Sequence, residues 1–128
     1  MTKAIETLKD LLAAGADGAT AISTPGGKPL SYAALRQLVR SAIDRLNAFG
    51  IGRNDRVAIV LNNGPLMATS FLAVAAGATS APLNPGYRAE EFEFYLTDLN
   101  ARALLIEQGM ASPAREVETT RDVEQVER

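Results

Sequence analysis

Apolar positions recur at steps of three and four after Ser31, and this pattern predicts a long amphipathic helix. The apolar positions of the stripe are Leu35, Leu38, Val39, Ala42, Ile43, Leu46 and Phe49. Ser31 is a good N-cap residue, and Gly50 with Gly52 would end the helix. A shorter amphipathic helix is expected near the start of the chain, with Thr2 as its cap and Gly15 as its stop.

Short apolar runs alternate with helical segments in the middle of the chain. The run at 56–61 (Arg-Val-Ala-Ile-Val-Leu) is typical of a strand that is covered on both faces. Further strands are expected at Ser80–Leu83 and Ala103–Ile106, and helices at Pro65–Gly77 and Ala89–Leu99. This order predicts an α/β fold, with a partial parallel-type sheet whose strands are joined by right-handed crossover helices.

Turn residues separate these elements. The segment Thr24–Pro29 (Thr-Pro-Gly-Gly-Lys-Pro) predicts a hairpin between Ala19–Ser23 and the extended course that resumes at Leu30. Two further turns, Asn62–Pro65 and Asn84–Tyr87, each lead from a predicted strand toward a helix. Packing should therefore bring the apolar helix faces onto the sheet, and the residues expected in the core include Tyr32, Phe49, Phe71 and Leu72.

The two ends of the chain are polar. Met1 to Asp10 carry too many charges for a signal peptide, so a cytoplasmic location is expected. The apolar stretch from Leu66 to Leu83 is interrupted by polar residues and Pro82, so it is interpreted as buried core and no membrane span is expected. Charged residues dominate from Arg115 to Arg128, and the predicted division is a packed portion, 1–112, and a polar charged tail, 113–128, solvated or loosely helical.

Composition removes several classes of function. The net charge of −2 gives no long-range attraction toward nucleic acid, so no nucleic-acid partner is expected. The chain has no cysteine and no histidine, which excludes disulfides, thiolate nucleophiles and a Ser-His-Asp triad and removes the usual ligands of transition metals. No catalytic residue and no metal ligand is therefore assigned.

Three motifs that suggest chemistry have simpler structural explanations. Gly50–Asp55 begins like a dinucleotide fingerprint, but a helix precedes it and a strand follows it, which is the reverse of the required order. Gly26–Pro29 resembles the end of a phosphate-binding loop, yet Pro29 replaces the required Ser or Thr. The acidic residues Glu90, Glu91, Glu93 and Asp98 are expected to form a solvated helix start.

Two stretches resemble the adenylate-forming enzymes, the superfamily of acyl-CoA synthetases and other AMP-binding enzymes. Leu30–Leu35 is similar to their first core motif, and Leu72–Pro85 (LAVAAGATSAPLNP) is similar to their second. Gly50–Val57 and the turn at Asn63–Pro65 stand between them at family-like spacing, although Leu66 replaces an acidic residue found in many relatives. The run 81–96 resembles the oxalate–CoA ligase and peroxisomal-type acyl-CoA synthetase branch.

This resemblance implies a two-step reaction, in which a small carboxylate attacks ATP to form an acyl-adenylate and the thiol of coenzyme A then displaces AMP. The complete enzyme would use ATP, magnesium and coenzyme A. The phosphate loop, the magnesium-holding acidic residue and the catalytic lysine of the family do not occur in these 128 residues. The resemblance therefore implies that 1–112 is the N-terminal portion of the large AMP-binding domain, inactive alone and holding no cofactor itself.

One site residue and one alternative function remain. Arg88 lies in the loop after the second motif, where some family members place a basic side chain on the nucleotide phosphate of coenzyme A, so Arg88 is the candidate for that contact. The alternative is a non-catalytic α/β association module that pairs with itself or with a full-length relative. A truncated sheet favours this alternative, because an exposed sheet edge or apolar helix surface would promote homo-oligomers.

Overall fold

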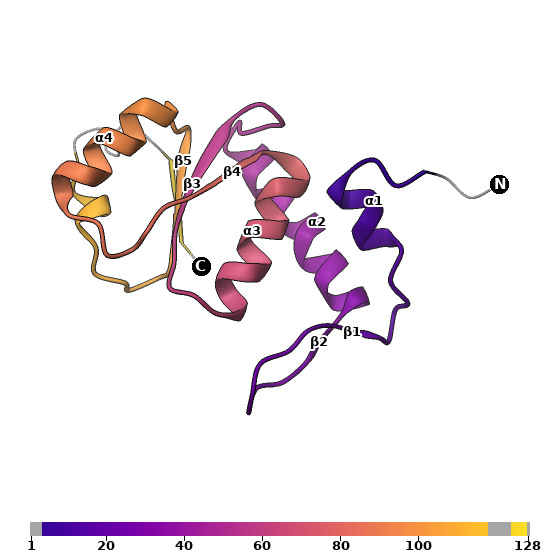
Figure 1. Ribbon diagram of the computed structural model, residues 1–128. Coiled ribbons are helices and arrows are strands. Elements are labelled where there is room, and N and C mark those ends of the chain that lie inside the picture. Colours follow the sequence, from indigo (N-terminus) through magenta and orange to yellow (C-terminus); the bar gives the residue numbers. More distant parts are fainter. Residues whose placement is uncertain (1–3, 118–123, 128) are drawn as a thin grey trace.

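Four parallel strands form the central sheet of the molecule (Figure 1). The computed structural model describes residues 4–117 and the backbone of 124–127. The strands lie in the order β4-β3-β5-β6, and they are β3 (Arg56–Val60), β4 (Thr79–Pro82), β5 (Ala103–Ile106) and β6 (Glu124–Glu127). All three strand pairs are parallel. The predicted α/β fold with a parallel sheet is confirmed, and its three predicted strands form at the expected positions.

Helices cover both faces of this sheet. α3 (Pro65–Gly77) joins β3 to β4 on one face, and α4 (Ala89–Leu99) joins β4 to β5 on the other. Side chains of β3 alternate between these faces: Val57 and Ile59 pack on the α3 side, whereas Ala58 and Val60 pack on the α4 side. Because neither face meets water, β3 has an uninterrupted apolar sequence.

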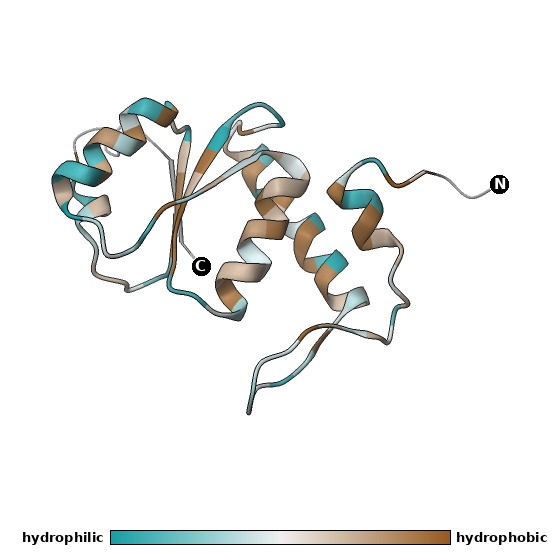
Figure 2. Cartoon of the chain, in the orientation of Figure 1, coloured by the Kyte–Doolittle hydropathy of each residue, from teal (hydrophilic) through white to brown (hydrophobic). Residues whose placement is uncertain are grey.

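A further layer lies on the outer side of α3. It contains α1 (Leu8–Ala13), the antiparallel hairpin β1 (Thr20–Ile22) with β2 (Leu30–Ser31), and the long helix α2 (Tyr32–Ala48). Apolar residues of α2 and α3 belong to one cluster. In Figure 2, hydrophobic positions, coloured brown, occur along both helices and along the central strands. The predicted N-cap is confirmed, because the Ser31 hydroxyl accepts from the Ala34 N–H at 3.1 Å.

The first helix begins later than its spacing predicts. Thr7, rather than Thr2, is the N-cap, and its hydroxyl accepts from the Asp10 N–H at 3.0 Å. Thr2 lies outside the described residues. Ile5 precedes the helix and is exposed. The pattern predicted the helix correctly but not its start, because two threonines compete as caps.

Two of the four named core residues are exposed. Phe49 follows the last buried turn of α2, and Phe71 lies on the flank of α3 between the faces that contact α2 and the sheet; their exposed fractions are 38% and 40%. Tyr32 and Leu72 are half-buried. The interpretation of the stretch Leu66–Leu83 as buried core is therefore wrong at Phe71. Within the described residues, no helix combines the length and the apolar character needed to cross a bilayer.

The described part of 113–128 is not the solvated tail that the sequence predicts. A short 3-10 helix, η1 (Pro113–Arg115), places Ala114 and the nearby Val117 in the core on the α4 side. β6 pairs in parallel with β5 at the edge of the sheet. A charge-rich composition did not reveal this strand, since an edge strand needs only its backbone to pair and often carries charges. The division of the chain at 112 stays a prediction.

Candidate functional site

A cavity of about 440 Å³ lies where β3 and β4 end. It is lined by Leu61, Asn62, Asn63, Met67, Pro82, Leu83, Asn84 and Pro85. The loop after β3 turns to α3 on one face of the sheet, and the loop after β4 turns to α4 on the other. Open parallel sheets bind ligands outside the carboxyl ends of their strands, and this cavity lies at that edge. This cavity is therefore the candidate functional site.

Neutral amides dominate the chemistry of this cavity. Asn62 and Asn63 follow β3 directly, and Asn84 follows β4. The Asn84 side-chain oxygen accepts from the Gly86 N–H at 2.8 Å, which leaves the Asn84 amino group to donate into the cavity region. None of the described residues that line the cavity carries a charged side chain. The arrangement suits hydrogen bonding to a polar ligand, and it supplies no acid, base or nucleophile.

The first turn of α3 adds backbone donors beside these amides. Gly64 is the N-cap residue of α3 and provides no side-chain cap, while Pro65 occupies the first turn. The backbone N–H groups that follow Pro65 therefore cannot donate a hydrogen bond to a side chain at position 64. Gly64 has φ 150° and ψ −172°, a combination that is essentially restricted to glycine. A side chain at position 64 would strain the loop that positions Asn62 and Asn63.

Arg88, the one site residue predicted from the sequence, lies beyond the cavity lining at the start of α4. Its side chain is 78% exposed. Nε of Arg88 is 3.4 Å from Glu91 Oε1 and 3.8 Å from Glu90 Oε2, and the Arg88 backbone N–H donates to Glu91 Oε1 at 3.1 Å. The guanidinium is thus accessible, but an incoming phosphate would compete with two carboxylates.

Tyr87, which the sequence placed only in a turn, lies between the cavity loop and Arg88. Its ring stacks on Tyr95 at a centroid distance of 5.0 Å and meets the buried Phe92 edge-on at 5.6 Å. Desolvation, followed by the neighbouring Tyr95, raises the pKa of the Tyr87 phenol above its ordinary value. Tyr87 therefore anchors the loop that carries Arg88, which explains why this loop holds a defined course.

The sequence pattern did not indicate Asn62, Asn63 and Asn84 as site residues, because asparagine is common in turns. Asn62–Pro65 and Asn84–Tyr87 were both predicted as turns, and the structure has loops there. A usable signal was present: both turns follow strands of a parallel sheet, and the carboxyl ends of such strands share one edge.

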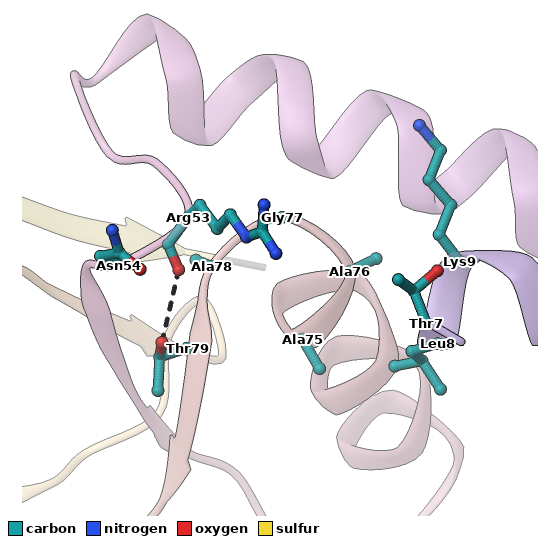
Figure 3. A pocket seen from close by; sticks show the side chains of 10 residues that line it. All are labelled: Thr7, Leu8, Lys9, Arg53, Asn54, Ala75, Ala76, Gly77, Ala78 and Thr79. Carbon is teal, nitrogen blue, oxygen red and sulfur yellow. Dashed lines mark hydrogen bonds between the residues drawn. The ribbon is translucent and has the colours of Figure 1, made fainter.

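A larger cavity, of about 540 Å³, lies at the opposite, amino edge of the sheet (Figure 3). Lys9 of α1 and Arg53, which precedes β3, supply its charged side chains. In Figure 3 the Arg53 side chain extends toward Gly77 at the C-terminal end of α3, where a helix favours a cation. The cavity lining includes no described residue from the loops at the carboxyl edge.

The remaining sequence motifs are structural in the described part of the chain. Gly26–Pro29 forms the turn region of the hairpin between β1 and β2, and the Gly52 N–H donates to Asp55 Oδ2 at 2.8 Å within the loop before β3. Neither segment opens a helix toward a phosphate. No group of three or more metal-binding side chains occurs among the described residues.

The comparison with protein families identifies the enzyme class to which this fold belongs. A model described as AMP-binding enzyme matches residues 12–128. The chain belongs to the AMP-binding enzyme family. It is 43% identical over 98 residues to an oxalate–CoA ligase of Arabidopsis thaliana, which covers 75% of this chain and 19% of that relative. It is 42% identical over 86 residues to a probable CoA ligase of Humulus lupulus, covering 66% of this chain and 16% of that protein.

Solved structures share the fold of this chain. VinN matches with a TM-score of 0.81 and 22% identity, over 95% of this chain and 31% of VinN. ATP-bound MatB from Rhodopseudomonas palustris matches with a TM-score of 0.80 and 23% identity, over 94% of this chain and 25% of MatB. The chain spans about a fifth of the length of the curated relatives it matches. The predicted resemblance to adenylate-forming enzymes is confirmed.

Proposed function

We propose that this chain is the N-terminal segment of an ATP-dependent carboxylate–CoA ligase and does not complete the reaction alone. The observation that carries the proposal is the 43% identity to an oxalate–CoA ligase, which spans three quarters of this chain. In the complete enzyme a carboxylate would form an acyl-adenylate with ATP, and coenzyme A would then take the acyl group. The proposal keeps the cytoplasmic location expected from the sequence.

The chemistry of the candidate site supports an inactive segment. Attack on the α-phosphate of ATP develops negative charge that lysine and magnesium must neutralise. The cavity between β3 and β4 is lined by amide and apolar side chains, and the described residues include no group of three or more His, Cys, Asp or Glu side chains that could hold a metal ion. The 128 residues also contain no Gly/Ser/Thr-rich phosphate loop that ends in lysine. This chain would therefore position part of the active-site floor and leave the reaction to residues outside it.

Pyrophosphate release tests the proposal. The purified chain is incubated with ATP, magnesium, coenzyme A and oxalate, and no carboxylate-dependent pyrophosphate is expected. In parallel, this chain replaces the aligned segment of the Arabidopsis oxalate–CoA ligase, and this chimera is expected to form oxalyl-CoA. The unmodified Arabidopsis enzyme is the positive control. Carboxylate-dependent turnover by the isolated chain, or an inactive chimera that is folded, would contradict the proposal.

Arg88 is proposed as a contact for the nucleotide phosphate of coenzyme A in the complete enzyme. Its exposed guanidinium and its place beside the loop at the carboxyl edge support this role. Calorimetric titration of the chimera with coenzyme A is expected to show weaker binding after Arg88→Ala. Dephospho-coenzyme A, which lacks the 3′-phosphate, is the matched ligand, and Arg88→Ala should leave its affinity unchanged. An equal loss for both ligands would remove Arg88 from the phosphate site.

A second candidate function is a non-catalytic association module that forms homo-oligomers or pairs with a full-length relative. The outer side of β4, which has no partner strand in the described part of the chain, and the exposed Phe71 and Phe94 favour association. Sedimentation velocity over a hundredfold range of concentration separates the two functions. A self-association that grows with concentration, together with an inactive chimera, would favour the module over the ligase segment.

A further inference from the structure

Asn63 is the one asparagine of the sequence that is followed by a glycine. In such a pair the backbone nitrogen of glycine can attack the side-chain carbonyl carbon of asparagine, because no Cβ atom hinders its approach. Asn63 also lines the candidate site, in the loop between the end of β3 and the start of α3. A covalent change at Asn63 would therefore alter the chemistry of this cavity.

Both groups that would react are accessible. Asn63 and Gly64 are exposed. Within the described part of the chain, neither the Asn63 side-chain amide nor the Gly64 N–H has a hydrogen-bond partner. A Cβ atom built at Gly64 would meet no atom within 4 Å, so the space around this residue is open. Hydrogen bonding and packing are the two restraints by which a fold slows this attack, and the described residues impose neither at Asn63.

The start of α3 favours the charge that the attack creates. As the glycine nitrogen bonds to the side-chain carbon of Asn63, negative charge develops on the side-chain oxygen. The N–H groups of Leu66 and Met67, in the first turn of α3, have no intrahelical carbonyl to donate to, and Gly64 supplies no side-chain cap. These N–H groups and the helix dipole stabilise an anion beside the amino end of the helix.

We propose that Asn63 is a deamidation site, and that its reaction makes the uncharged cavity at the carboxyl edge anionic. The Gly64 nitrogen gives its proton to a solvent base and bonds to Asn63 Cγ. The Cγ–Nδ2 bond breaks, and the side-chain nitrogen takes a proton from solvent and leaves as ammonia. Water then opens the resulting cyclic imide at either carbonyl, which leaves aspartate or isoaspartate at position 63. Either product adds one negative charge to the net charge of −2.

The other two asparagines of the cavity provide internal controls. Asn84 is followed by Pro85, which has no N–H, so the cyclic imide cannot form there by this route. Asn62 is exposed like Asn63, but the residue after it carries a side chain that hinders the backbone nitrogen. The inference goes beyond the proposed function and does not depend on it, since it concerns only the loop before α3.

Peptide mapping of aged protein tests the proposal. Trypsin cleaves after Arg56 and Arg88, so one peptide, 57–88, carries Asn62, Asn63 and Asn84. The purified chain is aged at mildly alkaline pH in water enriched in heavy oxygen and then digested in ordinary water, so that only conversion during ageing carries the label. Conversion at Asn63 is expected to be at least about tenfold faster than at Asn62, because glycine has no Cβ. Asn84 should stay unlabelled.

A matched pair of variants tests the assignment in the intact protein. Isoelectric focusing should show an acidic form that grows with time in the parent and in Asn62→Gln. Asn63→Gln should abolish this form, because glutamine has an additional methylene group and closes the corresponding ring far more slowly. Both variants keep an amide side chain at an exposed loop position. An acidic form that grows equally in Asn63→Gln and in the parent would overturn the proposal.

The folded and unfolded rates decide whether the fold leaves Asn63 open to attack. Ageing is repeated in guanidinium chloride, and the rate of Asn63 conversion in the folded chain is expected to lie within about tenfold of the unfolded rate, since the reaction needs no local opening. A folded rate below that range would overturn the proposal, because the loop would then hold the amide away from Gly64. Equal labelling of Asn62 and Asn63 in the folded chain would also overturn it.

Discussion

Nη1 of Arg36 donates to the carbonyl oxygen of Gly15 at 2.8 Å and to that of Leu12 at 3.0 Å. Nη2 of the same guanidinium pairs with Asp17. The Arg36 side chain is only 18% exposed, although Arg36 is not one of the apolar positions of the α2 stripe. Arg36 therefore satisfies carbonyls at the C-terminal end of α1, which have no partner within that helix, and ties α1 to α2.

Arg36→Ala is expected to lower the free energy of unfolding by about 2 kcal/mol, since it removes hydrogen bonds from a charged donor to half-buried carbonyls. Urea denaturation followed by circular dichroism measures this change. Arg40→Ala, at an exposed position one turn further along α2, is the control and should stay within about 0.5 kcal/mol of the parent. Equal losses from the two variants would show that Arg36 contributes only as a helix former.

Gly77 permits the close approach of α3 and α2. A Cβ atom at position 77 would lie 2.7 Å from Cγ1 of Ile43. Gly77→Ala is expected to destabilise the protein by about 1–2 kcal/mol, because the steric conflict exceeds the helix propensity that alanine gains. Gly52→Ala, where a Cβ would meet open space, is the control. Adding Ile43→Ala should remove most of the Gly77→Ala penalty, and simple additivity in this double-mutant cycle would contradict the explanation.

The central α/β elements could be predicted from the sequence because their signals are local. β3 and β5 are buried on both faces, and this burial produces the continuous apolar runs Arg56–Val60 and Ala103–Ile106. Pro65 opens α3 and Ser31 caps α2, as their positions predicted. Each of these features depends on a few adjacent residues.

The candidate site and the edges of the sheet depend on contacts between distant segments. Asn63 and Asn84 meet only because β3 and β4 are neighbours, so each alone indicated a turn. Phe71 is apolar in an apolar helix, and only the positions of α2 and the sheet show that its flank is uncovered. The charged sequence at Glu124–Glu127 concealed β6, since backbone pairing at an edge leaves no apolar pattern.

Ser70 of α3 carries a hydroxyl with no hydrogen-bond partner among the described residues, and the side chain is fully buried. Ser70→Ala is therefore expected to raise the free energy of unfolding by about 1 kcal/mol, by removing an unsatisfied polar group and improving helix propensity. Ser80→Ala is the matched control, because its hydroxyl donates to Phe71 and its loss should destabilise the protein. Thermal and urea unfolding measure both. A less stable Ser70→Ala protein would reveal a partner for this hydroxyl.

Tyr87 is expected to make stability depend on alkaline pH. Desolvation and then Tyr95 raise the pKa of the folded Tyr87 phenol above its ordinary value, near 10. The stability that Tyr87 contributes is fully present below the pKa of its phenol in the unfolded chain. It is lost as pH rises through the pKa of the phenol in the folded protein, because the unfolded chain releases this proton first. Urea midpoints between about pH 9 and 12 should fall less steeply for Tyr87→Phe than for the parent. Parallel curves would show that Tyr87 is not responsible.

Glu90→Gln is expected to strengthen coenzyme A binding to the chimera if Arg88 contacts the nucleotide phosphate. Glu90 Oε2 lies 3.8 Å from Arg88 Nε, so its charge competes with an incoming phosphate. The interaction is exposed, and the gain should be about two- to fivefold and decrease with added salt.

Glu93→Gln is the matched control for this change. It removes the same charge from α4, and Glu93 makes no ion pair with Arg88 among the described residues. Glu90 is preferred to Glu91 as the test position because Glu91 also accepts from the Arg88 backbone N–H and so stabilises the start of α4. In an Arg88→Ala background, Glu90→Gln and Glu93→Gln should have the same small effect on affinity. If Glu90→Gln still strengthens coenzyme A binding in the Arg88→Ala background, the phosphate contacts a cation other than Arg88. The Glu90 charge would then act on the phosphate by long-range repulsion and not by competition for Arg88.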